Sequence, residues 1–94
     1  MNKEKIATEA HKTIDNWIEK ANDLEQKKDE LDKSARDQFN KKLTELDKKK
    51  EELQNKYKEL KNASDENLNE MMKAYNASLD HFKKGIREIE LILS

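Results

Sequence analysis

The sequence predicts an all-α fold, an antiparallel three-helix bundle, from three observations. The 94-residue chain has no proline and one glycine, Gly85, so almost every stretch is permitted to be helical. Apolar residues return every three or four positions from Ile6 to Leu93, which is the period of an amphipathic helix. Two interruptions of this period, each beside capping residues, divide the chain into three segments of similar length.

The first predicted helix covers residues 4–33. Its apolar seam includes Ile6, Ile14, Trp17 and Leu24. The tetrapeptide Ser34-Ala35-Arg36-Asp37 resembles a capping box. In this motif a serine hydroxyl accepts a hydrogen bond from a backbone amide that has no partner within the helix, and an acidic residue follows three positions later. We therefore expect the first break of the chain at Ser34.

The second predicted helix covers residues 36–62, and the third covers residues 65–93. Asn62 stands at the expected end of one, and Ser64, followed by two acids, is the expected N-cap of the next. In chain order, residues 1–33 carry seven bases and nine acids, residues 34–62 nine bases and six acids, and residues 63–94 four bases and six acids. A basic middle helix between two acidic ones favours an up-down-up order with short connections.

A second architecture stays open at this stage. In it, one long helix reaches about residue 62, the last segment folds back, and two chains pair as a coiled-coil dimer. Either way, residues 1–94 are expected to form a single helical domain. Leu, Ile and Phe together number only 18 residues and valine is absent, so the core is thin. Because small domains with thin cores often complete their burial by self-association, we expect a homo-oligomer, most simply a dimer.

The expected interaction surface lies at the carboxyl end of the chain. The adjacent apolar residues Leu91, Ile92 and Leu93 point in directions that span a wide arc around a helix, so one partner helix does not cover them all. We expect a second chain to pack on this surface, which comprises Ile86, Ile89, Leu91, Ile92 and Leu93.

No catalytic, cofactor or metal site is expected, so the chain is not predicted to be an enzyme. It has no cysteine and no Gly-rich phosphate loop. His11 and Asp15 share a helical face, but a zinc site needs three or four ligands. The lysines of the middle segment are interleaved with acids, so this band is expected to be a solvated face and nucleic acid is not an expected partner.

Two classes of function remain. The first is a soluble interaction or scaffold protein that works through helix–helix contacts and binds a protein partner. The alternative is a peripheral lipid-surface binder, whose helices open and lay their apolar faces on a membrane. The net charge of −1 and the narrow apolar stripe favour the first. Because the first six residues lack the apolar region of a secretory signal and no run has the roughly 20 apolar residues of a membrane span, we expect a cytoplasmic location.

The second half of the chain also carries a family resemblance. The run FNKKLTELDKKKEELQNKYKELKNAS, from Phe39 to Ser64, combines an aromatic residue, a Leu-x-x-Leu step and a Lys/Glu-rich heptad pattern; apolar positions continue at Leu68, Met71, Leu79, Phe82 and Ile86. Over these residues the chain resembles a family of small bacterial helical proteins with coiled-coil sequences, stress-induced and apolipoprotein-like. Asp65 stands where that family usually has glycine, and Leu68 and Leu79 stand where it commonly has tryptophan. The resemblance implies an all-helical, stress-associated protein and transfers no catalytic residue.

Overall fold

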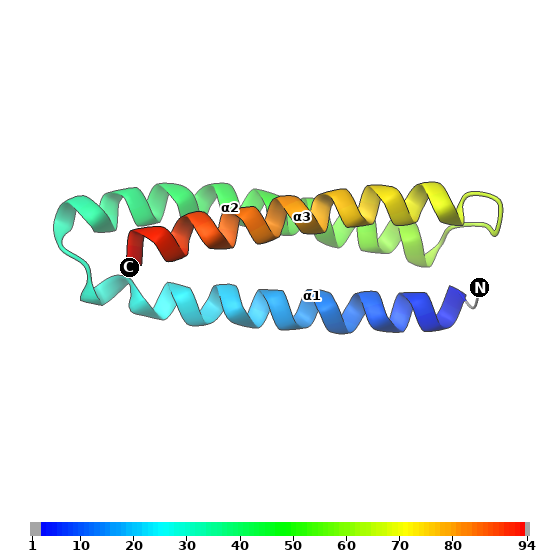
Figure 1. Ribbon diagram of the computed structural model, residues 1–94, viewed down its shortest axis with the longest axis horizontal. Coiled ribbons are helices and arrows are strands. Elements are labelled where there is room, and N and C mark those ends of the chain that lie inside the picture. The colour runs from blue at the N-terminus through cyan, green and yellow to red at the C-terminus, as the bar shows by residue number, and fades with distance from the viewer. Residues whose placement is uncertain (1–2, 94) are drawn as a thin grey trace.

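Three antiparallel helices run side by side in the computed structural model, which describes residues 3–93 (Figure 1). The helices are α1 (Lys3–Glu25), α2 (Lys33–Lys61) and α3 (Leu68–Leu93), and a short 3₁₀ helix, η1 (Gln26–Glu30), follows α1 directly. The Cα atoms extend over 50 × 17 × 16 Å. The predicted all-α three-helix bundle is confirmed, and the single chain does not form the alternative long helix, because it reverses direction between η1 and α2.

The first reversal occurs earlier than expected. Leu31 and Asp32 have extended backbone, with ψ of 150° and 172°, and Asp32 is the N-cap of α2: its carboxylate accepts a hydrogen bond from the amide of Ala35 at 2.8 Å. The expected capping box is therefore wrong, since Ser34 lies inside α2. The physical reason is that aspartate is as good a cap as serine, and Asp32 comes first along the chain.

The second reversal is close to its expected place. Asn62 ends α2, and its amide donates to the carbonyl of Lys58 at 3.1 Å. A turn follows, in which the amide of Asn67 lies 3.4 Å from the Ser64 hydroxyl and 3.1 Å from its carbonyl. This turn occupies the residues expected to open the third helix, so α3 begins at residue 68 rather than 65.

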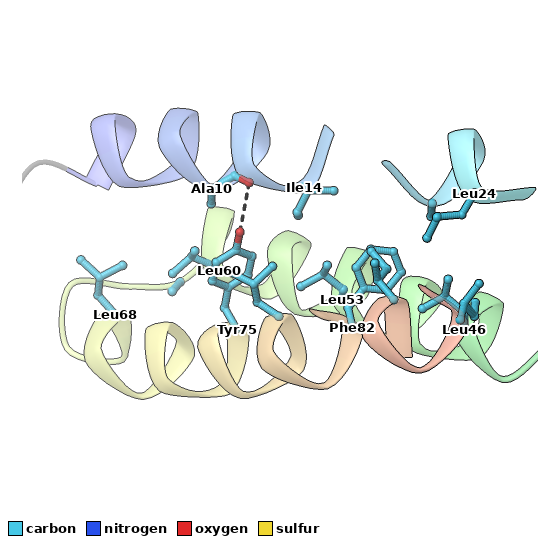
Figure 2. Packing of buried hydrophobic residues seen from close by; sticks show 14 of the residues in the cluster. Ala10, Ile14, Leu24, Leu46, Leu53, Leu60, Leu68, Tyr75 and Phe82 are labelled. Carbon is cyan, nitrogen blue, oxygen red and sulfur yellow. Dashed lines mark hydrogen bonds between the residues drawn. The ribbon is translucent and has the colours of Figure 1, made fainter. Parts of the chain in front are cut away.

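Two rows of buried side chains, each with a spacing of seven residues, join α2 to α3. Together they form what we term the heptad ladder, in which one residue of each helix per two helical turns lies in the core that α2 and α3 share, on the side that α1 covers (Figure 2). The α2 row is Phe39, Leu46, Leu53 and Leu60, and the α3 row is Leu68, Tyr75, Phe82 and Ile89. All eight positions belong to the apolar seam read from the sequence, so the predicted core of these two helices is confirmed.

Close approach of α2 and α3 depends on Gly85. A Cβ atom at this position would lie 2.8 Å from Cδ1 of Leu46 and 3.4 Å from Cδ of Lys49. Leu46 is itself buried in the heptad ladder, so it has little room to retreat. One heptad earlier on the same face, the buried Ser78 hydroxyl lies 3.3 Å from Oε1 of Glu52 on α2. Small residues thus bring the two helices close together at these positions.

The first prediction concerns this contact. We expect Gly85→Leu to lower the free energy of unfolding by about 2 kcal/mol, because roughly 3 kcal/mol of overpacking exceeds the ~1 kcal/mol that helix propensity gains when glycine is replaced. Ala77→Leu, at an exposed position of the same helix, should change stability by less than about 0.5 kcal/mol. Urea unfolding followed by circular dichroism measures both variants. Equal stability of the two would show that α2 and α3 do not need the close approach.

Candidate interaction surface

The carboxyl-terminal cluster expected to form an interaction surface is largely inside the chain. Ile86 and Ile89 are fully buried at 0% exposure, and Ile92 and Leu93 are partly buried against the same core. Leu91 alone of the five is exposed, at 73%. Ile86 and Ile89 are buried within the single chain because α3 has two neighbouring helices, so a wider arc of it is covered than in a pair of helices.

The first helix is attached less extensively than the other two are to each other. It contributes four buried apolar residues, of which two are alanines: Ala10, Ile14, Ala21 and Leu24. The larger side chains of Ile6, Trp17 and Ile18 pack against the core while remaining partly exposed. Because alanine buries little apolar surface, α1 gains less hydrophobic stabilisation per turn than α2 and α3 gain from the heptad ladder.

An open groove runs along one side of α1, between it and α2. Apolar side chains at its base include Ala7, Ile14, Ile18 and Tyr57, and charged groups at its edges include Lys58 and Lys61. The His11 and Tyr57 rings meet across it, with centroids 5.7 Å apart. We call this the α1–α2 groove. It offers apolar contact with a mainly basic rim on α2.

Two separate open pockets lie along the other side of α1, between it and α3. The one near the amino end of α1 is lined by Ile6, Met72 and Leu79, among others, and the one near the carboxyl end by Leu24 and Leu93. We call the first of these the α1–α3 groove. Since both flanks of α1 leave apolar side chains accessible, the helix is the least enclosed element of the bundle.

Polar contacts position α1 on the other helices. The Tyr75 hydroxyl donates to the carbonyl of Ala10 at 3.0 Å, a buried bond between residues 65 positions apart (Figure 2). Nζ of Lys20 lies 3.4 Å from Oε1 of Glu90 on α3, at exposed positions. The ring of Trp17 lies between two ammonium groups, with Lys20 at 5.0 Å and Lys83 of α3 at 5.3 Å. Only the tyrosine bond is protected from solvent, so it is the strongest of these tethers.

Two pKa shifts accompany these contacts. Burial, with a smaller effect from Tyr57, raises the pKa of Tyr75 to about 12. Hydrogen bonding to Glu88 and the charge of Glu45 raise the pKa of Lys42, which bridges α2 to α3 through a 3.3 Å contact with Glu88. The raised pKa values keep Tyr75 neutral and Lys42 positively charged at neutral pH. Both groups therefore act as contacts between helices.

His11, which shares a helical face with Asp15, lies at the α1–α2 groove. His11 Nδ1 is 3.5 Å from a carboxylate oxygen of Asp15, and both side chains are exposed. Within residues 3–93 no three side chains of His, Cys, Asp or Glu gather as a possible metal site. None of the helices in the same range is long and apolar enough to cross a membrane.

Neither groove was predicted from the sequence, because Tyr57 and Ile18 recur with the same helical period as residues that are fully buried.

Comparison with known proteins found no matching family model, no matching curated protein and no matching solved structure.

A prediction follows from the Tyr75 hydroxyl. Tyr75→Phe should lower the free energy of unfolding at pH 7 by about 1 kcal/mol, through loss of the bond to Ala10. Because the folded-state pKa of about 12 exceeds the ordinary value of 10.0, the neutral phenol stabilises the fold below pH 10, and this contribution is lost as the pH rises toward 12.

Denaturant unfolding at pH 7 to 11.5 measures this dependence. Tyr75→Phe should show a smaller loss of stability above pH 10 than the unchanged chain. Tyr57→Phe, at a partly exposed position of the α1–α2 groove, retains Tyr75 and its burial and should keep most of the alkaline loss. Identical alkaline profiles for the unchanged chain and Tyr75→Phe would contradict this assignment.

Proposed function

We propose that the chain is a non-enzymatic interaction or scaffold protein that works through helix–helix contacts, and that α1 is the helix that exchanges with a partner. The observation that carries this proposal is the unequal packing of the bundle. The heptad ladder joins α2 to α3 along their length through Phe, Leu, Tyr and Ile side chains, whereas two of the four buried residues of α1 are alanines and α1 is flanked by open grooves. The least buried element of a fold is the one that opens at the lowest free energy.

Release of α1 would uncover an apolar stripe suited to another amphipathic helix. Tyr75 would lose its partner on α1, and Leu60 and Leu79 lie on the same side of the α2–α3 hairpin, at the α1–α3 groove. A helix laid into such a groove is a common mode of recognition, with apolar anchors at three- and four-residue spacing. A partner helix with the α1 pattern of apolar residues would therefore meet the same contacts as α1.

The cytoplasmic location and the stress association also belong to this proposal. The stress association is supported by the resemblance of residues 39–86 to stress-induced helical proteins. Partners on this reading are proteins, including further copies of the chain.

Displacement of α1 by a peptide tests the proposal directly. Trp17 is the only tryptophan, so a peptide of residues 3–25 carrying Trp17→Phe is silent in fluorescence while the protein reports on its own α1. We expect the emission of Trp17 to shift to the red at millimolar peptide, since the attached helix has an effective concentration of that order.

The matched control is the same peptide with Ile14→Asp, which places a charge at a buried contact of α1. It should leave the emission unchanged. Tyr75→Phe protein should respond to the first peptide at nearly the same concentration, because the attached α1 and the peptide both lose the bond from residue 75 to the Ala10 carbonyl. If both peptides act equally, or neither acts on either protein, the proposed exchange of α1 is wrong.

The lipid-surface alternative makes a different prediction. Among residues 3–93, Leu91 is the one large apolar side chain classed as exposed, so the closed bundle presents no broad apolar face to a membrane. We therefore expect the chain to stay in the supernatant when anionic vesicles are sedimented. Pelleting that is abolished by Leu91→Glu/Leu93→Glu would instead favour the lipid-binding function.

A further inference from the structure

The connection between α1 and α2 is built almost entirely of helix-forming residues. Residues 25–33 contain neither glycine nor proline, and η1 already continues the helical path of α1 as far as Glu30. Only Leu31 and Asp32 are outside a helix, both with negative φ, of −93° and −71°. The backbone of two ordinary residues therefore determines whether the chain reverses or continues.

The apolar seam also continues across this reversal. Leu24, Leu31 and Phe39 are separated by seven and eight residues, and Ala35 stands between the last two. This spacing is helical, with one stutter, so a straight helix through the connection would keep its apolar residues on one face. Leu31 itself is only partly buried in the single chain.

We propose that a second copy of the chain is the partner of α1, through reciprocal exchange of this helix. In the exchanged dimer, α1, η1 and α2 straighten into one helix of about 60 residues, roughly 90 Å long. Each α1 then packs on the α2–α3 hairpin of the other copy. The inference rests on the proposed function, since α1 must first leave its own hairpin, and it names the partner.

Exchange preserves the contacts that hold α1 in the single chain. The Tyr75 bond to Ala10, the Lys20 contact with Glu90 and the Lys83 contact with Trp17 are all made by α1 to α3, so each re-forms between copies. Two local bonds are lost at the connection: the Asp32 cap on Ala35 and the 3.2 Å bond from Arg36 to the Leu31 carbonyl. In return, the helix ends at the connection gain intrahelical partners for their free amides and carbonyls. Such reciprocal exchange is a low-cost route to a twofold dimer.

Two neighbouring substitutions are expected to move the monomer–dimer equilibrium in opposite directions. Asp32→Ala removes the cap and improves helix propensity, which should tighten dimerisation roughly tenfold per chain and about 100-fold for the two connections of a dimer. Lys33→Pro should do the reverse. Residue 33 is the first of α2, where proline is well tolerated, and ψ of 172° at Asp32 suits a residue that precedes proline.

Inside a continuous helix the same proline is strongly unfavourable, so Lys33→Pro should weaken the dimer at least about 10⁴-fold while the closed bundle is kept. Lys33→Ala is the matched control for loss of the charge alone and should behave nearly as the unchanged chain. Sedimentation equilibrium over a dilution series gives each dissociation constant. Circular dichroism checks that Lys33→Pro is still helical.

Carbodiimide cross-linking then identifies which dimer has formed. Light and ¹⁵N-labelled chains are unfolded together, refolded and coupled at the Lys20–Glu90 contact, whose charged atoms lie 3.4 Å apart. For an equal mixture of the two chains, about half of the coupled peptide pairs in an exchanged dimer contain one light and one heavy partner, whereas a dimer of closed bundles gives only pairs of a single label.

Mixed-label pairs in the dimer fraction, with dissociation constants rising from Asp32→Ala through the unchanged chain to Lys33→Pro, are the expected result. Single-label pairs alone, equal constants for the two variants, or no dimer of Asp32→Ala at millimolar concentration would each overturn the inference. The peptide displacement experiment separates the two proposals. Displacement without an exchanged dimer leaves the interaction function standing and removes the second copy as partner, whereas failure of both removes both.

Discussion

The heptad ladder between α2 and α3 is the contact on which the other parts of the bundle depend. Eight buried side chains alternate across it, and Gly85 lets the two helices approach until a single added carbon would lie 2.8 Å from Leu46. Interior packing of this kind is sensitive to even one methylene. The hairpin of α2 and α3 is thus the rigid part of the molecule, and it provides the surface on which α1 is placed.

The first helix is held by smaller buried side chains, two of them alanines, and a buried hydroxyl contributes to its attachment. The Tyr75 bond to Ala10 sets the position of α1 along α3, because a donor in this apolar setting has one carbonyl within reach. The grooves on both sides of α1 result from this sparse packing. A helix that is aligned by one buried bond and enclosed on neither flank is well suited to exchange, which is why the proposed function is assigned to α1.

Charge balance shapes the surface of the bundle more than its stability. Almost half of the residues are charged, yet the contacts that cross between helices, such as Lys20 with Glu90 and Lys42 with Glu88, are solvent-exposed. Exposed pairs contribute up to about 1 kcal/mol each. Their effect is to favour one arrangement of the three helices over others, while the near-zero net charge leaves compaction unopposed.

The sequence by itself determined the helical class, favoured three helices over the long-helix alternative, and indicated the core of α2 and α3, because apolar residues spaced seven apart lie on one face of a helix and no proline interrupts the pattern. Only the tertiary structure decided three further points. The first reversal is at Asp32 rather than Ser34, since neighbouring residues have similar capping ability and the core selects between them. Ile86 and Ile89 are buried because two helices of the same chain cover α3. The grooves beside α1 exist because alanine occupies buried positions of α1 where a closer fit needs larger side chains. The periodicity of a sequence predicts the direction in which a residue faces, but not how completely neighbouring side chains enclose it.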